Sequence, residues 1–307
     1  MTSIREILVD SERRLTRAGI DSASVDAAEL LGFVLGVRRN RLLLQDQIDE
    51  EDRIIFERLL AKRLQRAPLQ HLVGSAPFRH IELRVGPGVF IPRPETELVA
   101  EAAIRHLREC EAPRAFDLCA GSGAIALSLA YEVPGARVSA VEMSSEALPW
   151  LRENISLVNT QIPVEVVHAD ATNLNVASFV SAAGACDVVT CNPPYIPDNM
   201  VPRDPEVKDH EPHIALYGGP DGLDVVRGIV LTAGMLLKPG GLLVIEHADV
   251  QGPHASNGGV VEVVRQARVP AGMAEVIAGS VGSKMFENIE DRQDYNQAPR
   301  FTMANRV

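Results

Sequence analysis

From residue 114 onward, short apolar segments alternate with longer segments of helical periodicity, and this alternation constrains the possible folds more than any other feature. The predicted strands are 115–119, 137–141, 164–168, 187–191 and 241–245, and the predicted helices are 123–131, 144–157 and 223–237. Strands and helices in this order form a mostly parallel sheet with right-handed crossovers and helices on both faces. Because ligands of such sheets bind beyond the carboxyl ends of the strands, the residues after each strand are the first candidates for a site.

Residues 1–74 predict a small helical domain. Three segments carry apolar residues at helical spacing: Ile4, Ile7 and Leu8; Ala27, Leu30, Leu31 and Val34; and Ile54, Ile55, Leu59 and Leu60. Gly36 is a stop signal for the second helix, and Asp49 is a suitable N-cap for the third. Three apolar stripes need partners to cover them, so a bundle is the expected arrangement.

A β-hairpin is predicted to join the two parts. Ile81, Leu83 and Val85 alternate with polar residues, Gly86-Pro87-Gly88 is a turn signal, and residues 89–91 are apolar again. A helix is then expected over residues 95–110. These observations predict a helical domain over 1–74, a hairpin linker over 75–94 and an α/β domain over 95–307.

Charge and composition narrow the function. The formal net charge is -11, and the acidic surplus lies after residue 74. Phosphate backbones are bound by clustered Lys and Arg, so the acidic main domain argues against direct nucleic-acid binding. The four cysteines match no zinc spacing, and no metal is expected. Neither a signal peptide nor a membrane span is visible, so a cytoplasmic protein is expected.

The first three strand ends carry a pattern suited to a nucleoside. Gly121, Gly123 and Ala126 fit the loose glycine pattern of a nucleotide-binding turn, which alone is weak. Glu142 ends the second strand, where a carboxylate can accept hydrogen bonds from ribose hydroxyls. Asp170 follows the third strand, where it can accept from an adenine amino group. Lys and Arg are absent from these loops, so the pattern indicates an adenosine without a diphosphate, which S-adenosylmethionine fits. The predicted cofactor-binding residues are Asp117, Cys119, Ala120, Gly121, Ser122, Gly123, Glu142, Asp170, Ala171 and Asn192.

The fourth strand runs into Asn192-Pro193-Pro194-Tyr195. Two prolines stiffen a loop and remove N–H donors, so carbonyl oxygens and the Asn192 side chain can act as acceptors for an NH2 group. Tyr195 offers an aromatic plane for a flat group. An amide or aryl amine nitrogen held here in line with a methyl sulfonium gains rate by proximity. The predicted catalytic residues are Asn192, Pro193 and Tyr195, with Pro194 also binding substrate; a catalytic acid or base is not expected, and His213, Glu246 and His247 are interpreted as structural.

Further blocks make the chain resemble the HemK (PrmC) family of peptide chain release factor glutamine N5-methyltransferases. They are Pro68 to Gly74, Ile91-Pro92-Arg93-Pro94-Glu95-Thr96-Glu97, Glu211-Pro212, Ala215-Leu216 and Gly218 to Leu223. The Asn-Pro-Pro-Tyr motif is shared with DNA adenine and RNA guanine methyltransferases. The block around Arg93 (residues 91–97) and the Gly218 block (residues 218–223) are what favour the release factor family over those enzymes.

The resemblance implies a seven-stranded class I methyltransferase domain, Rossmann-like, behind a helical N-terminal domain. It implies methylation of the glutamine in the Gly-Gly-Gln motif of class I release factors, which the N-terminal domain would dock. By position, residues 119–123 and Glu142 would bind the cofactor, and Asn192 to Tyr195 would hold the glutamine.

The chain departs from the family at three places. Cys119 and Ala120 stand where Gly and Thr are common, Ala248 stands where Gly is usual, and residues 287–300 differ from the usual ending. The long polar segment 197–212 is predicted to be a mobile lid.

Two other functions remain open from the sequence. One is a methyltransferase acting on adenine N6 or guanine N2 of nucleic acid. The other is a non-catalytic nucleotide-binding protein, against which the intact Gly121, Glu142 and Asn192 argue.

Overall fold

The computed structural model describes residues 2–277 and 279–307, and the chain divides into two compact units. The first unit runs to Ser75 and also includes Val85–Pro87 and Pro202–His210. The second unit comprises Ala76–Arg84, Gly88–Val201 and Glu211–Val307. No helix in the described part of the chain has the length and apolar character needed to cross a membrane.

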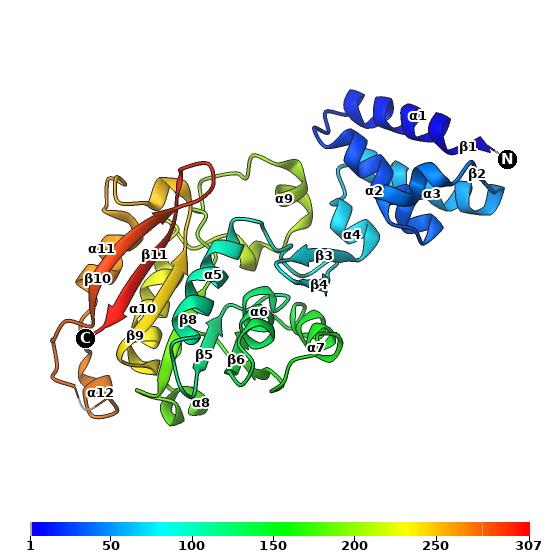
Figure 1. Ribbon diagram of the computed structural model, residues 1–307. Helices are drawn as coiled ribbons and strands as arrows, with labels where there is room; N and C mark the ends of the chain where they lie inside the picture. The colour runs from blue at the N-terminus through cyan, green and yellow to red at the C-terminus, as the bar shows by residue number, and fades with distance from the viewer. Residues whose placement is uncertain (1, 278) are drawn as a thin grey trace. The chain divides into compact units, whose positions relative to one another are not determined.

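The first unit is built mainly from helices (Figure 1). They are α1 (Ile4–Arg17), α2 (Ala23–Leu35), the 3-10 helix η1 (Arg39–Leu44), α3 (Glu50–Leu64) and α4 (Leu69–Val73), with strands β1 (Thr2–Ser3) and β2 (Gln47–Ile48) forming an antiparallel pair. The predicted helix ends are confirmed. Gly36 takes the left-handed conformation after α2, with φ of 64°, which favours glycine. The side chain of Asp49 caps α3 by accepting from Asp52 N at 2.9 Å.

The apolar stripe predicted for α3 is partly wrong. Ile54 and Ile55 are 49% and 40% exposed, whereas Phe56 and Leu60 are fully buried. The buried face also includes Arg63, whose Nε donates to Asp26 at 2.6 Å. Counting apolar residues alone missed this face because a paired arginine occupies one of its positions.

The second unit contains the seven-stranded sheet that the resemblance implies. Its order is β10-β11-β9-β8-β5-β6-β7, with β9, β8, β5, β6 and β7 parallel and β10 and β11 antiparallel at one edge (Figure 1). The strands are β5 (Arg114–Leu118), β6 (Arg137–Glu142), β7 (Glu165–His168), β8 (Cys186–Cys191), β9 (Leu237–Glu246), β10 (Phe286–Gln293) and β11 (Pro299–Arg306). The five predicted strands are confirmed, and the atypical segment 287–300 supplies most of β10 and the start of β11.

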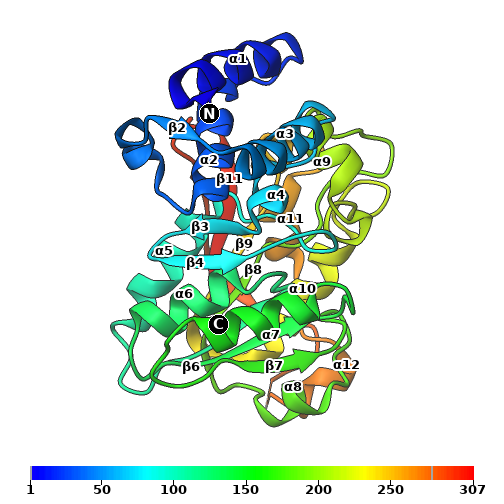
Figure 2. The same ribbon diagram turned by 90° about the vertical axis from the view of Figure 1, so that its right-hand side faces the viewer.

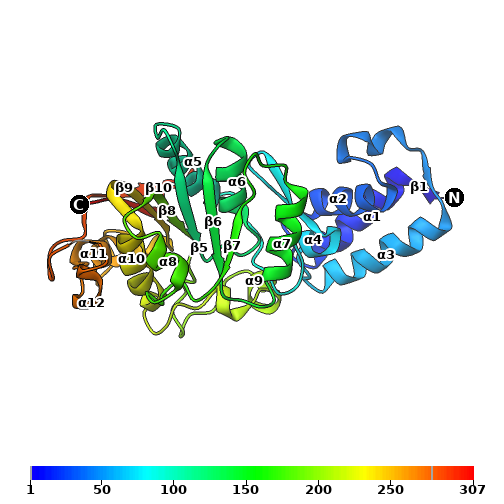
Figure 3. The ribbon, with the colours of Figure 1, turned by 90° about the horizontal axis from the view of Figure 1, so that it is seen from below.

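Helices cover both faces of this sheet. In Figure 3, α5 and α6 lie on one face, and α10 and α11 lie on the other. The helices of the unit are α5 (Thr96–Leu107), α6 (Ala124–Glu132), α7 (Leu148–Leu157), α8 (Ala177–Ser181), α10 (Asp224–Leu236), α11 (Gly259–Gln266) and α12 (Ala271–Ala274), with short 3-10 helices η2 (His213–Ala215) and η3 (Asp249–Gln251). The remaining helix, α9 (Pro205–His210), belongs to the first unit.

The hairpin lies elsewhere than predicted. Strand β4 (Ile81–Arg84) has the expected alternation of buried and exposed residues, but it pairs with β3 (Ser75–Phe78), and residues 89–91 form no strand (Figure 2). The turn is at Arg79, which has φ of 50°, a conformation that is uncommon for arginine. The glycine and proline residues at 86–88 predicted a hairpin turn there, but side-chain contacts place the turn at Arg79.

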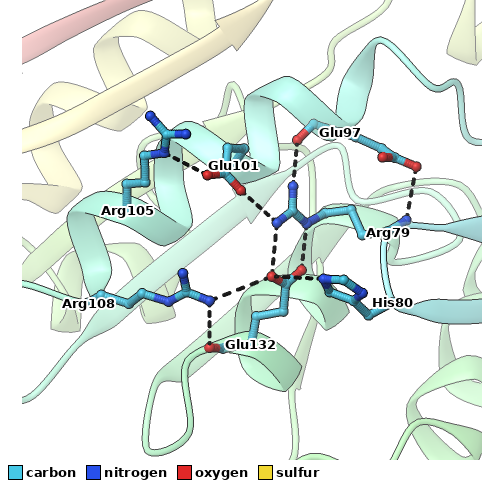
Figure 4. Close-up of polar contacts among 7 residues, drawn as sticks. All are labelled: Arg79, His80, Glu97, Glu101, Arg105, Arg108 and Glu132. Atoms are coloured by element: carbon cyan, nitrogen blue, oxygen red, sulfur yellow. Dashed lines mark hydrogen bonds and ion pairs between the residues drawn. The ribbon is translucent and has the colours of Figure 1, made fainter.

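Those contacts hold the Arg79 side chain from three sides (Figure 4). Its guanidinium donates to Glu132 at 2.5 and 2.9 Å, to Glu101 at 2.7 Å and to the Glu97 carbonyl at 3.1 Å. Its backbone N donates to the Glu97 carboxylate at 3.0 Å. These charge-assisted bonds are strong because the geometry is bidentate and the groups are largely buried, so the hairpin turn is fixed to α5 and α6.

Candidate active site

The glycine loop between β5 and α6 has a backbone that only a few residue types adopt readily. Gly121 and Gly123 have φ of 56° and 87°, and Cys119 has φ of 63°. A side chain added at Gly123 would meet Leu151 at 2.7 Å, whereas nothing lies within 4 Å of one at Gly121. The left-handed conformation at Cys119 explains why a glycine suits this position in the resembled family.

Glu142, at the end of β6, lies against this loop. Its Oε2 accepts from Gly121 N at 2.7 Å, and its Oε1 accepts from Ser144 N at 2.7 Å. The residue is buried. Because each carboxylate oxygen can accept two hydrogen bonds, Glu142 can hold the loop and still accept from a ligand hydroxyl. The predicted meeting of Gly121 and Glu142 at one edge of the sheet is present in the structure.

Asp117 and Asp170 differ sharply in their surroundings. Asp117 is buried, accepting from Thr190 Oγ1 at 2.8 Å and from Ala126 N at 3.1 Å, and burial raises its pKa to about 7. These bonds tie β5 to β8 and to the start of α6. Asp170 is exposed, and its Oδ1 accepts from the backbone N and the hydroxyl of Thr172, both at 2.8 Å. Asp170 therefore lies where a ligand can reach it, while Asp117 supports the glycine loop from inside the fold.

The acceptor loop, defined as Asn192 to Tyr195, follows β8 with both prolines buried. It is clasped by the Gly218 block. A side chain on Gly218 would come within 2.5 Å of Pro194 O, and one on Gly222 within 2.2 Å of Tyr195 O. Gly218 N also donates to Ile196 O at 2.9 Å. The glycines of this block thus allow a close backbone approach, which is a structural reason for their presence.

Two of the loop carbonyls are therefore turned into the protein. Pro194 O faces Gly218, and Tyr195 O accepts from Gln251 Nε2 at 2.8 Å. The remaining candidate acceptors of this loop are the oxygen of the Asn192 side chain and the carbonyls before Pro194. Burial raises the pKa of Tyr195, and the nearby negative charge of Glu246 acts in the same direction, so the phenol stays neutral.

Sequence reasoning missed two supporting side chains. Gln251 holds the acceptor loop through Tyr195, and its Oε1 accepts from Ala248 N at 3.2 Å. Asn154, on α7, is fully buried and bonds the backbone of Arg84 and Ser122. The one signal for Asn154 was a polar residue three positions after Leu151 on the apolar face of a predicted helix. Ala248 itself has φ of -67° and ψ of 153°, an extended conformation that does not require glycine.

Arg93 lies close enough to Tyr195 and Glu246 for its charge to act on both. Arg93 forms an ion pair with the carboxylate of Glu211, and its guanidinium lies 4.9 Å from the centre of the Phe90 ring. Burial raises the pKa of Glu211 to about 7, although the charge of Arg93 acts the other way. This pair anchors residue 211, where the chain returns to the second unit after 202–210.

The two histidines named in the sequence, His213 and His247, have partners outside the acceptor loop. His247 is buried, with its ring nitrogens 2.9 Å from Ala248 O and from Asp291 Oδ2. The ring of His213 stands 5.0 Å from that of Tyr217. Both contacts fit the structural roles expected of them. Among the described residues, no group of three or more His, Cys, Asp or Glu side chains could hold a metal ion.

The donors and acceptors at these strand ends fit S-adenosylmethionine. The open face at Gly121, the fixed carboxylate of Glu142 and the exposed carboxylate of Asp170 suit a nucleoside. No lysine or arginine occurs in residues 117–126, 142–144 or 168–172, so a diphosphate would find no counter-charge. Fold and site together define a methyltransferase, and residues 80–203 match the family model described as the methyltransferase small domain.

Comparison with known proteins gives the family. Residues 6–74 match the PrmC N-terminal domain. The release factor glutamine methyltransferase of Streptomyces coelicolor is 41% identical over 98% of this chain and 97% of its own length. That of Mycolicibacterium smegmatis is 40% identical over 100% and 99%, and that of Mycobacterium tuberculosis H37Rv is 35% identical over 99% and 92%. This chain belongs to the release factor glutamine methyltransferase family.

Solved structures give more distant matches. The Thermus thermophilus 16S rRNA N2 G1207 methyltransferase, in complex with AdoMet and guanosine, aligns with a TM-score of 0.47 and 20% identity. The alignment covers 76% of this chain and 50% of that chain. A likeness this distant does not bear on the substrate.

Proposed function

We propose that this protein transfers the methyl group of S-adenosylmethionine to the side-chain amide nitrogen of the glutamine in the Gly-Gly-Gln motif of class I release factors. Full-length relatives named release factor glutamine methyltransferase support this proposal. The observation that carries it is the acceptor loop, a stiff, donor-poor turn clasped so that the Asn192 side chain remains available as an acceptor. The proposal places the protein in the cytoplasm, where release factors act.

S-adenosylmethionine supplies an electrophilic methyl group on a sulfonium. The residues proposed to hold it are Asp117, residues 119–123, Glu142, Asp170, Ala171 and Asn192, with Asp117 acting through the loop rather than by contact. Glu142 would accept from the ribose hydroxyls and Asp170 from the adenine amino group.

The acceptor loop would bind the glutamine amide and orient its nitrogen. Asn192 Oδ1 and a carbonyl before Pro194 would accept the two amide hydrogens, and Tyr195 would support the flat amide group. As the new N–C bond forms, positive charge develops on the nitrogen, and acceptors already aimed at its hydrogens stabilise that charge without reorganising. The nitrogen loses its proton after methyl transfer, so the loop needs no strong base.

The first unit is proposed to dock the release factor. The described helices α1 to α3 form a core of their own, and residues 6–74 match the PrmC N-terminal domain. The two roles are thus separated: a helical unit for recognition and a sheet-based unit for chemistry.

Transfer of labelled methyl groups tests the proposal. Purified release factor, DNA and tRNA would be offered in parallel, with a release factor whose Gly-Gly-Gln glutamine is replaced by alanine as the control. The proposal predicts transfer to the unaltered release factor alone. Transfer only to nucleic acid would instead support an exocyclic-amine methyltransferase and overturn the proposal.

A further inference from the structure

Three side chains from different parts of the second unit lie close together at the start of the acceptor loop. Asn192 follows β8, Thr96 begins α5 and Glu246 ends β9. Asn192 Nδ2 donates to Thr96 Oγ1 at 3.3 Å. Thr96 also lies beside the Glu246 carboxylate and acts to lower its pKa, against the larger effect of burial. Thr96 and Glu246 are 3% and 1% exposed, so these contacts are shielded from water.

The chemistry of these groups fixes the direction of the bonds. A threonine hydroxyl has one hydrogen to donate, and an ionised carboxylate can only accept. Because Thr96 accepts from the Asn192 amide, its own hydrogen is available to the Glu246 carboxylate beside it when that carboxylate is ionised, above its pKa of about 7. The amide nitrogen of Asn192 therefore points toward Thr96, and the Oδ1 atom of Asn192 is the one that can face a ligand.

Glu246 has no evident role in stability that would explain its position. Its Oε2 is buried and has no hydrogen-bond partner among the described residues. A buried acceptor left unsatisfied destabilises a fold, and each such group needs an explanation. The groups around the carboxylate are Arg300 of β11, Arg93, Glu95 and Thr96 near the start of α5, Tyr195, and Cys191 at the end of β8.

We propose that Thr96 and Glu246 are positioning residues, which hold the Asn192 side chain with its oxygen toward the substrate NH2 group. The inference rests on the proposed function and revises the interpretation of Glu246 as merely structural. Were the carboxylate neutral or replaced by an amide, Glu246 could donate, Thr96 could donate to Asn192, and the Asn192 amide could turn its nitrogen toward the substrate. An amide nitrogen that faces an NH2 group places one hydrogen-bond donor against another, which is unfavourable for substrate binding.

Conservative variants separate positioning from packing. Thr96→Val keeps the shape and removes the hydroxyl, Thr96→Ser keeps the hydroxyl, and Glu246→Gln keeps the shape and removes the charge. We expect Thr96→Val and Glu246→Gln each to lower kcat about tenfold, the effect of one oriented hydrogen bond, with cofactor Kd within about twofold of wild type as measured by calorimetry. Thr96→Ser should keep kcat within about threefold. Because the residues act as one chain, the double variant Thr96→Val/Glu246→Gln should be no slower than the slower single variant.

The result that would overturn the inference is wild-type kcat in Thr96→Val, equal losses in Thr96→Ser and Thr96→Val, or multiplying losses in the double variant. If Glu246→Gln does not fold, the Thr96 pair still decides. The wild-type protein is first assayed on release factor and on nucleic acid. Transfer only to nucleic acid refutes the proposed function, whereas the pattern among the variants, measured on whichever acceptor is methylated, judges the positioning chain separately.

Discussion

Replacing Asn154 by alanine should destabilise the second unit more than any other single polar truncation on α7. The Asn154 Oδ1 accepts from Arg84 N at 2.6 Å, and its Nδ2 donates to Arg84 O at 3.0 Å and to Ser122 O at 2.9 Å. The side chain thus joins strand β4 to the glycine loop. Its complete burial means that water cannot simply replace these bonds.

The magnitude follows from the number of bonds. Each lost hydrogen bond costs about 1 kcal/mol net, and a buried partner left unsatisfied costs about 1–3 kcal/mol. With three bonds lost and Ser122 O buried, we expect a loss of about 3–5 kcal/mol. That is a large fraction of the stability of a typical domain, about 5–15 kcal/mol, so the variant should fold but unfold at much lower denaturant concentration.

Urea unfolding followed by tryptophan fluorescence measures this loss. Trp150 is the only tryptophan in the chain and lies on α7 in the second unit, so its signal reports that unit. Glu153→Ala is the matched control, because Glu153 is the exposed neighbour on the same helix, and we expect a change within about 0.5 kcal/mol. A loss below about 1 kcal/mol in Asn154→Ala would refute the reasoning.

Four further predictions follow from the site and the hairpin. Asn192→Ala should lower kcat about 100-fold or more, as for removal of a transition-state hydrogen bond, with cofactor affinity only partly weakened; unchanged turnover in a methyl-transfer assay would contradict this. Glu142→Ala should weaken cofactor binding about tenfold or more, since it removes the loop support and a ribose acceptor; calorimetry giving wild-type affinity would show that neither contact contributes to cofactor binding. Burial raises the pKa of Glu246 from 4.5 to about 7. Between these pH values the folded wild-type protein binds more protons than the unfolded protein, so its stability falls as the pH rises through them. The stability of Glu246→Gln relative to wild type should therefore increase by on the order of 3 kcal/mol from pH 4 to 8, and a pH-independent difference in urea unfolding would count against this prediction. Arg79→Ala breaks a largely buried ion pair with Glu132 and should cost about 2–4 kcal/mol; equal melting of variant and wild type in calorimetry would show that the hairpin turn is fixed by other contacts.

Much of the second unit was predictable because its strands are buried on both faces. Continuous apolar runs such as 242–245 are typical of strands inside a sheet that is covered on both faces, and the ends of the parallel strands then bring Gly121, Glu142 and Asn192 to the same edge. The antiparallel strands β10 and β11 were not predicted, because edge strands with one solvated face, such as Glu287 to Arg292, have a weaker apolar signal.

The wrong predictions concern places where contacts between polar side chains, and not the local sequence pattern, determine the structure. The hairpin turn lies at Arg79, held by Glu132 and Glu101, rather than at the glycines of 86–88. On α3, the buried face runs through Phe56, Leu60 and Arg63, which pairs with Asp26, and not through the two isoleucines of the predicted stripe. Pairings between residues far apart in sequence have no local pattern, so a single sequence does not reveal them.

The segment 197–212, which was predicted to be a lid, makes ion pairs that the sequence did not suggest. Within the first unit, Glu206 of α9 accepts from Arg63 at 2.7 Å and from Arg66 at 2.8 Å. The ion pairs lower the pKa of Glu206, although burial acts the other way. The mobility of residues 197–212 stays a prediction, and these ion pairs would have to break if α9 moved away from α3.

The proposed chemistry depends on an acceptor loop that presents lone pairs to a planar NH2 group. A crystal structure of the protein with S-adenosylhomocysteine and a release factor fragment bearing the Gly-Gly-Gln motif tests it most directly. The glutamine amide nitrogen should lie within hydrogen-bonding distance of Asn192 Oδ1 and of a carbonyl before Pro194, and it should face the cofactor sulfur. A loop turned away from the sulfur, or a glutamine bound through the Asn192 nitrogen, would contradict it.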